Sequence, residues 1–187
     1  KAKGEDRFLP AQEELVRALQ TVEGMTSISV SINTENTNVI MGKEVHTIWG
    51  KDTISDTIHV RDTENDFALT DKGITFAISP LSFYQVNPVQ TEKLYSTAIE
   101  YAELTGEETI LDAYCGIGTI GMIASDKAKR VIGVELNSDA VRDARVNAKI
   151  NKIENIELYN KDAGEFMVQM AEQDEKADVV FMDPPRQ

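Results

Sequence analysis

The sequence contains a single cysteine, Cys115, among its 187 residues. A disulfide within the chain is therefore excluded, and so is a zinc or iron–sulfur site built from several cysteines of this chain. Long apolar runs are absent as well, since no stretch approaches the roughly 20 residues of a membrane-spanning helix. Residues 1–6 are polar and do not begin with Met. We therefore expect a fragment of a longer protein from a reducing, cytoplasmic compartment, with no metal site.

Positive charge is scarce too. The chain has 19 Lys and Arg against 32 Asp and Glu, which gives a net charge of −13. Neither half of the sequence contains the basic stripe with which a surface neutralises nucleic-acid phosphates. We therefore do not expect these residues to bind nucleic acid on their own, although 41% hydrophobic residues predict a folded protein.

Residues 1–80 have mostly the pattern of short strands. A helix is predicted over residues 10–21, because Leu15, Val16 and Leu19 recur at helical spacing. Short alternating runs predict strands, and turn-forming residues predict turns between them. The strands are predicted at 27–32, 39–41, 45–49, 54–60, 67–70 and 74–78, and the turns at 33–38 and 71–73. We expect residues 1–80 to form a small β-rich region of the α+β type.

Residues 81–187 show a different rhythm, in which apolar strand-like runs alternate with helical periodicity. Such alternation predicts a parallel sheet with helices on both faces, as in Rossmann-like α/β folds. The strands are predicted at 109–114, 131–135, 156–159 and 177–182. The helices are predicted at 88–104, 138–150 and 163–173, and over a segment that ends near residue 128.

An acidic residue stands close to the end of each predicted strand in this second part. These residues are Asp112, Glu135, Asp162 and Asp183. Parallel strands end at the same edge of a sheet, and the ligands of such sheets bind beyond that edge. The four carboxylates are therefore predicted to surround one ligand site.

A glycine-rich turn follows the first of these strands, with Gly116, Gly118 and Gly121 in the order G-x-G-x-x-G. Glu135 follows at roughly the distance found in dinucleotide-binding proteins, so NAD is one candidate ligand. Gly116 and the helix after it bring backbone N–H groups close to a ligand. However, the nearby acids would repel the pyrophosphate of NAD. They favour S-adenosylmethionine, which has no phosphate and carries a sulfonium and an ammonium group.

Three of the acids have predicted partners on this cofactor. Asp112 would accept from the ammonium group, Glu135 from both ribose hydroxyls, and Asp162 from the adenine amino group. Simpler roles stay open: Asp112 as a cap of the turn, Glu135 as a solvated strand end, and Asp162 as the N-cap of the next helix. Tyr114, directly after the first strand, is either a cofactor contact or a core aromatic residue.

Four segments of the second part contain motifs of a known family. Residues 111–121, LDAYCGIGTIG, are similar to its first S-adenosylmethionine motif, and residues 133–151 are similar to its second motif. Residues 82–87, SFYQVN, are similar to its F-x-Q-x-N signature. Residues 180–186, VFMDPPR, are similar to its D-P-P-R motif. Together they resemble the RNA uracil-C5 methyltransferases, and residues 1–80 fit that family only loosely.

The resemblance implies a Rossmann-like methyltransferase fold that is truncated in this chain. It also implies roles for four residues. Gln85 would contact the methionine part of the cofactor, Tyr114 would lie along it, and Glu135 would hold the ribose. Asp183 would line the pocket shared by the cofactor and the target base. Thr119 departs from the Asn that this family often has at its position.

The chemistry is implied by the resemblance as well. In this family a cysteine thiolate adds to C6 of uracil, C5 then attacks the methyl group, and a base removes the C5 proton. Both catalytic residues follow the D-P-P-R motif there, so we expect none within this chain, and we expect Cys115 to be a buried turn residue. The implied partner is RNA, with ribosomal RNA preferred over transfer RNA. An OB-like domain that carries much of the RNA contact is expected outside the sequence.

Other functions compete with this interpretation. One alternative is an amino-group methyltransferase, but such enzymes commonly have an aromatic residue at the position of Arg186, which counts against this alternative. An NAD-dependent oxidoreductase is disfavoured by the acids, and a non-catalytic module formed by residues 1–80 is a further alternative. The last predicted strand would lack the later strands of the fold at one edge. We expect that edge to favour association with another copy.

Overall fold

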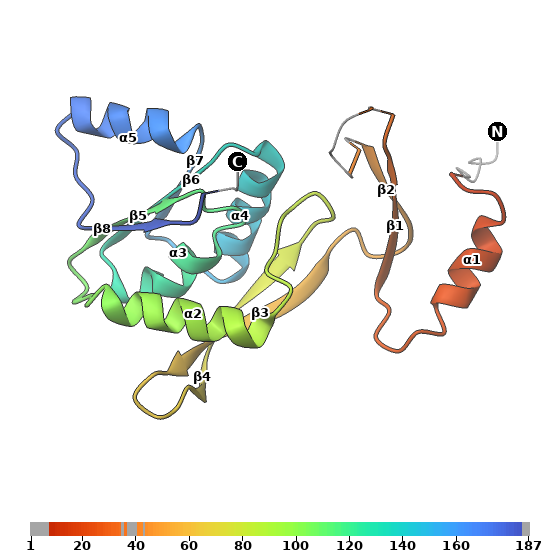
Figure 1. Cartoon of the computed structure of the whole chain (residues 1–187), viewed down its shortest axis with the longest axis horizontal. Helices are drawn as coiled ribbons and strands as arrows, with labels where there is room; N and C mark the ends of the chain where they lie inside the picture. The colour runs from red at the N-terminus through yellow and green to blue at the C-terminus, as the bar shows by residue number, and fades with distance from the viewer. Residues whose placement is uncertain (1–7, 35, 37–40, 43, 185–187) are drawn as a thin grey trace. The chain divides into compact units, whose positions relative to one another are not determined.

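The computed structural model describes residues 8–34, 36, 41–42 and 44–184 (Figure 1). Its contacts divide the chain into two compact units. The first unit comprises Lys1–Ile54 and Ser79–Leu81, and the second comprises Ser55–Ile78 and Ser82–Gln187. The boundary expected after residue 80 stays a prediction; the contacts group residues 55–78 with the second unit. In the described part of the chain, no helix has the length and apolar character needed to cross a bilayer.

The described residues of the first unit form a helix, α1 (Gln12–Leu19), and the strands β1 (Ser27–Ile32) and β2 (Glu44–Gly50). β1 and β2 pair antiparallel, with a bulge between Ile28 and Ser29. The helix predicted over 10–21 and the strands predicted at 27–32 and 45–49 are confirmed within a few residues. Most of the strand expected at 39–41 lies outside the described residues, as does much of the turn expected at 33–38.

The second unit begins with a hairpin of two strands, β3 (Ile54–Asp62) and β4 (Ala68–Ile78). The turn predicted at 71–73 is wrong, because these residues lie inside β4. The chain reverses instead at 63–67, where Asp66 and Phe67 have φ angles of 46° and 57°.

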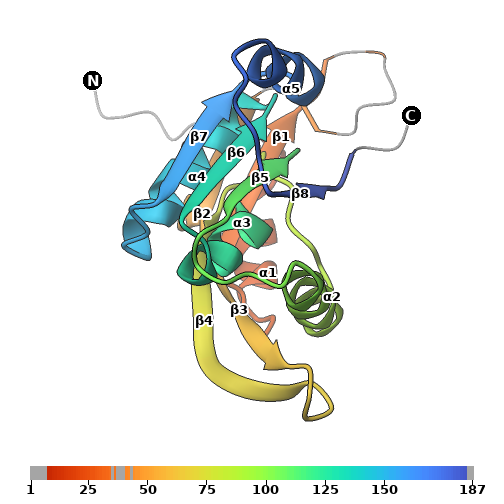
Figure 2. The ribbon, with the colours of Figure 1, turned by 90° about the vertical axis from the view of Figure 1, so that its left-hand side faces the viewer.

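Gly73 allows β3 and β4 to lie close together and is not part of a turn. A Cβ atom at residue 73 would lie 3.0 Å from a side-chain atom of His59 and 3.0 Å from one of Thr57, both on β3. β4 is strongly curved around this region (Figure 2). Glycine within a strand typically marks such a close contact or bend.

A parallel sheet with the strand order β7-β6-β5-β8 forms the rest of the second unit. Its strands are β5 (Thr109–Ala113), β6 (Arg130–Glu135), β7 (Ile156–Asn160) and β8 (Val179–Met182). Its helices are α2 (Pro88–Tyr101), α3 (Thr119–Ala124), α4 (Ser138–Ile150) and α5 (Ala163–Glu172), with a 3₁₀ turn at Ser125–Lys127. The predicted alternation of strands and helices is confirmed.

Helices cover both faces of this sheet, as predicted (Figures 1 and 2). On one face, Ile110 and Val131 pack with residues of α2, α3 and α4 and of the hairpin. On the other face, Leu111 and Ile132 pack against Phe166 of α5. Because neighbouring residues of a strand point to opposite faces, a strand covered on both sides has to be apolar throughout. Asp112 is therefore exceptional, since it lies on the α3 side of β5 and is buried.

Asn147 of α4 and Asn151, the residue that caps the end of α4, bind the backbone of β4. The Asn147 side chain accepts from the Ala77 N–H at 2.8 Å and donates to the Ala77 carbonyl at 3.1 Å. Asn151 makes the same pair of bonds with Thr75, at 3.1 Å and 2.8 Å. Asn147 is fully buried. The side-chain amides therefore satisfy backbone groups of β4 as a further strand would.

The backbone of β3 is bound in a similar way by α2. The Glu92 carboxylate accepts from the His59 N–H at 2.9 Å, and Ser96 Oγ accepts from the Arg61 N–H at 2.8 Å. Glu92 is 4% exposed and also pairs with the Arg61 guanidinium. Burial alone would raise the pKa of Glu92, but the hydrogen bonds from His59 and Arg61 outweigh it and lower that pKa. The buried charge is thus compensated, as buried charges must be.

β8 lies at one edge of the sheet within the described residues. Two of its apolar side chains are partly exposed, Val180 at 46% and Met182 at 55%. The expected association through this edge stays a prediction.

We predict that Asn147→Ala destabilises the protein by about 2–4 kcal/mol, because it leaves two backbone groups of β4 without partners and opens a small void. Urea unfolding followed by circular dichroism measures this change. Lys149→Ala on the exposed side of α4 is the control and should change stability by less than about 0.5 kcal/mol. Equal effects of the two substitutions would contradict the structural role of Asn147.

Candidate functional site

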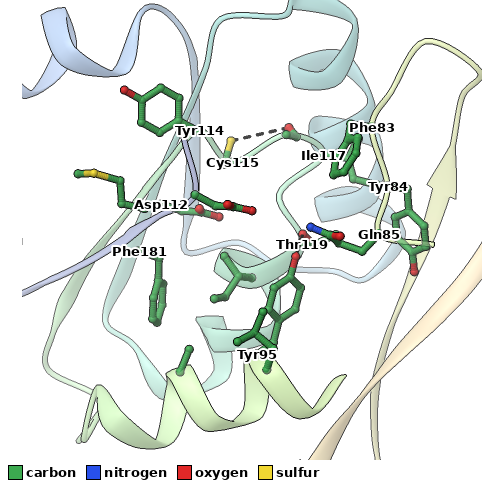
Figure 3. A pocket seen from close by; sticks show the side chains of 16 residues that line it. Phe83, Tyr84, Gln85, Tyr95, Asp112, Tyr114, Cys115, Ile117, Thr119 and Phe181 are labelled. Carbon is green, nitrogen blue, oxygen red and sulfur yellow. Dashed lines mark hydrogen bonds between the residues drawn. The ribbon is translucent and has the colours of Figure 1, made fainter. Parts of the chain in front are cut away.

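A cavity of about 290 Å³ opens at the carboxyl ends of β5 and β8 (Figure 3). β6 and then β7 extend the sheet on one side of β5, whereas β8, which follows β7 in the chain, pairs with the other side, so the strand order reverses at β5. Ligands of open parallel sheets bind at such a switch point. Five predicted site residues line the cavity, namely Gln85, Asp112, Tyr114, Gly116 and Asp183.

The turn between β5 and α3 has an unusual backbone. Tyr114, Gly116 and Gly118 have φ angles of 66°, 55° and 83°. The Cys115 N–H donates to the Val134 carbonyl at 3.0 Å, which attaches the turn to β6. A left-handed conformation is costly for a residue with a side chain, and such strain is concentrated at functional sites. A Cβ atom at Gly116 would meet nothing within 4 Å, so the backbone is open at this point.

The position of Asp112 explains the third glycine of the pattern. Asp112 is 3% exposed, and its Oδ2 accepts from the Gly121 N–H at 3.0 Å. A Cβ atom at residue 121 would lie 2.8 Å from that oxygen and 3.1 Å from Val131 Cγ1. Gly121 is therefore needed to let α3 approach β5 across a buried carboxylate. The predicted capping of the turn by Asp112 and its predicted contact with a ligand are compatible in this geometry.

The charge on Asp112 is disfavoured in the free protein. Burial raises its pKa to about 7, and the negative charges of Glu135 and Asp183 add to the effect. The hydrogen bond from Gly121 opposes this rise without cancelling it. A cation placed in the cavity would favour the ionised form.

Glu135 lies behind the glycine turn, and it is not among the residues that line the cavity. Its Oε2 accepts from the Gly116 N–H at 3.1 Å, and its Oε1 accepts from the Asn137 N–H at 2.7 Å. The carboxylate therefore links the end of β6 to the turn after β5. This role goes beyond the solvated strand end that is the simplest interpretation of the sequence.

The four predicted acids all stand at the carboxyl edge of the sheet, but not all of them reach the cavity. Asp183 follows β8 directly and lines the cavity, although it is exposed. Asp162 is exposed and caps α5, because its Oδ1 accepts from the Glu165 N–H at 3.0 Å. Its predicted contact with adenine stays a prediction. In the described part of the chain, no cluster of three or more His, Cys, Asp or Glu is arranged to hold a metal ion.

Cys115 is buried within the turn, with 6% of its surface exposed. Burial raises the pKa of its thiol well above the ordinary value, and the charges of Asp112 and Glu135 raise it further. A thiol in this environment is a poor nucleophile. Pro185 and Arg186 of the D-P-P-R motif lie outside the described residues.

Sequence reasoning missed several residues that line the cavity. Leu94, Tyr95 and Ala98 come from α2, and Thr119 is the first residue of α3. The Tyr95 hydroxyl lies 3.2 Å from Thr119 Oγ1. Leu94 and Ala98 recur at helical spacing, which indicates an apolar face but not that this face borders a cavity.

Comparison with solved structures identifies the fold. The crystal structure of Pyrococcus abyssi tRNA (uracil-54, C5)-methyltransferase in complex with S-adenosyl-L-homocysteine is similar, with a TM-score of 0.55 and 29% sequence identity. The similarity covers 85% of this chain and 34% of that one. The predicted fold class is confirmed: this is the Rossmann-like fold of the S-adenosylmethionine-dependent methyltransferases.

The sequence also matches a family model. Residues 90–187, just over half of the chain, match the model described as "Conserved hypothetical protein 95", and the chain belongs to this family. It is 44% identical over 182 residues to an "Uncharacterized RNA methyltransferase" of Clostridium tetani, covering 97% of this chain and 37% of that protein. A protein of the same name from Listeria monocytogenes is 48% identical over 178 residues, covering 95% of this chain and 36% of that protein. The chain spans little more than a third of the length of these curated relatives.

We predict that Asp112 makes stability depend on pH. Its pKa is about 7 in the folded protein against an ordinary value of 3.8, so the folded state holds the proton more firmly than the unfolded state. The stability that this group contributes is complete below pH of about 4 and is lost as the pH rises through about 7. Between these limits the wild type should lose up to about 4 kcal/mol relative to Asp112→Asn.

Urea unfolding of both proteins at a series of pH values checks this prediction. Asp52→Asn, at an exposed position, is the control and should keep the pH dependence of the wild type. Parallel stability curves for the wild type and Asp112→Asn would show that Asp112 does not titrate in this range.

Proposed function

We propose that this chain holds the cofactor-binding cavity of an S-adenosylmethionine-dependent RNA methyltransferase. Its curated relatives from Clostridium tetani and Listeria monocytogenes are named RNA methyltransferases. The similar Pyrococcus abyssi enzyme is described in complex with S-adenosyl-L-homocysteine. Both the sequence motifs and the fold are consistent with this assignment.

The observation that carries the proposal is the acidic character of the cavity at the switch point. Asp112 and Asp183 line it, and Glu135 lies directly behind Gly116. Negative charges attract a ligand that carries ammonium and sulfonium groups, and they repel the pyrophosphate of a dinucleotide. The glycine turn is compatible with either ligand, so the acids favour S-adenosylmethionine over NAD.

The cavity residues fit the parts of this cofactor. Asp112 would accept from the ammonium group, which would relieve the cost of ionising a buried carboxyl. Gln85 and Tyr114 would contact the methionine part, and the open backbone at Gly116 would let the ligand approach. When bound, the cofactor supplies an electrophilic methyl group.

Two further acids are proposed to act at the periphery of the ligand. Glu135 would hold the ribose hydroxyls, since each carboxylate oxygen can accept a second hydrogen bond besides the one from the backbone. Asp183 would line the space between the cofactor and the target base. Asp162 is proposed to accept from the adenine amino group with its capacity beyond the capping bond.

The proposed methyl acceptor is C5 of uracil in RNA. The F-x-Q-x-N segment supports this proposal because Phe83 and Gln85 both line the cavity, and the name of the Pyrococcus abyssi enzyme gives the same chemistry. Ribosomal RNA is preferred from the family resemblance, and transfer RNA is the alternative. The thiolate and the base are proposed to lie outside this chain, because burial leaves Cys115 protonated.

We predict that the protein binds S-adenosylhomocysteine and does not bind NAD at comparable concentrations. Glu135→Gln should weaken binding of S-adenosylhomocysteine by about 1–3 kcal/mol, because it removes a charged acceptor of the ribose hydroxyls. Isothermal titration calorimetry measures both effects. Glu172→Gln, exposed at the end of α5, should bind like the wild type. Tighter binding of NAD than of S-adenosylhomocysteine would refute the cofactor assignment.

We predict that the full-length protein releases tritium from RNA labelled at uracil C5 as it transfers methyl groups. Methylation at C5 replaces the hydrogen on that carbon, whereas methylation of an amino group leaves it in place. The measurement compares released tritium with incorporated methyl on ribosomal RNA and on transfer RNA. Methyl transfer without tritium release would exclude uracil C5 as the acceptor.

A further inference from the structure

The cavity has a second wall that is made of neutral hydrogen-bonding groups. Tyr95 of α2, Thr119 of α3 and Gln85 from the segment before α2 contribute it. Figure 3 shows their polar ends gathered on one side of the cavity, with Asp112 on the other side. No Lys or Arg occurs among the described residues that line the cavity. The cavity therefore has an acidic wall and a wall of uncharged donors.

The hydroxyl of Tyr95 lines the cavity and is able to donate into it. It lies 3.2 Å from Thr119 Oγ1, and Gln85 lines the same cavity. The hydroxyl of Thr119 and the amide of Gln85 are both donors, and the phenolic oxygen can accept from both. Either hydroxyl of the Tyr95–Thr119 pair can be the donor. When Thr119 donates to the phenolic oxygen, the proton of Tyr95 is left for an acceptor in the cavity.

That proton stays on Tyr95 across the ordinary pH range. Burial is the largest cause that raises the pKa of Tyr95, and the charges of Asp112 and Asp183 raise it further. The hydrogen bond with Thr119 acts in the opposite direction and does not reverse the rise. Tyr95 is therefore a neutral donor close to two acids.

We propose that Tyr95 and Thr119, together with Gln85, bind the α-carboxylate of the amino-acid part of the cofactor, while Asp112 accepts from its ammonium group. This inference rests on the proposed cofactor and deepens it. Of these three donors, the family resemblance implies a contact only for Gln85, and Thr119 departs from the resemblance. The assignment of Tyr95 and Thr119 comes from the geometry of the cavity.

Charge balance explains why neutral donors suit this wall. An α-amino acid carries a positive and a negative group on the same carbon, so both walls have to act within a few ångströms. A Lys or Arg close to the carboxylate would also pair with Asp112 and Asp183 and would weaken their attraction for the ammonium group. Hydroxyl and amide donors bind the carboxylate without neutralising the acids.

Calorimetry on the full-length protein with two probes tests this proposal. The probes are S-adenosylhomocysteine and its decarboxylated analogue, which keeps the ammonium group but lacks the carboxylate. Tyr95→Phe keeps the ring and removes the donor. It should weaken binding of S-adenosylhomocysteine roughly ten- to hundredfold, the usual effect of a hydrogen bond to a charged group. Binding of the analogue should change by less than about twofold.

Two further variants complete the test. Tyr101→Phe, at a position of α2 that is 80% exposed, is the matched control and should bind both probes like the wild type. Thr119→Val should cause a smaller loss that is also confined to S-adenosylhomocysteine, and it provides a second measurement if Tyr95→Phe does not fold. Equal losses for both probes, or no loss for either, would overturn the proposal and leave Tyr95 as a packing residue between α2 and α3. A wild type that binds neither probe would overturn the cofactor assignment itself.

Discussion

The buried carboxylate of Asp112 is the constraint on which the site depends. It lies between β5 and α3, and the Gly121 N–H is bound to it. Residue 121 has to be glycine because the carboxylate occupies the space of a side chain. The turn has to bring α3 back to the end of β5 within a few residues, which requires the positive φ angles of Tyr114, Gly116 and Gly118. The acidic cavity, the glycine turn and the short helix are therefore parts of one packing arrangement.

The parallel sheet is the most predictable part of the fold, because strands covered on both faces require continuous apolar runs such as Val131–Val134. The hairpin is less predictable. Asp71, Lys72 and Gly73 form a typical turn sequence, yet they lie inside β4. The position of this strand depends on bonds from Asn147 and Asn151, which are 70 and 76 residues away from their partners. Local sequence contains no signal for contacts of that kind.

The candidate site, too, could be predicted where it depends on the topology of the sheet, and not where it depends on local backbone geometry. Parallel topology alone places Asp112, Glu135 and Asp183 at one edge of the sheet, so their association could be predicted. Whether each carboxylate faces the cavity depends on the turns, as the backbone bonds of Glu135 show. The pair of Tyr95 and Thr119 depends on how α2 lies beside α3, and no spacing rule connects two residues on different helices.

The hairpin of β3 and β4 belongs to the same compact unit as the parallel sheet, although it precedes α2 in the sequence. Its Ile58 and Phe76 lie in the core that includes α2, α3 and α4. Without it, Glu92 would remain as an unpaired charge on the helix that carries Tyr95. We therefore expect the hairpin and the cavity to be exchanged together when related genes recombine. Recombination that joins foreign sequence before residue 55 preserves this unit, whereas a junction after residue 80 divides it.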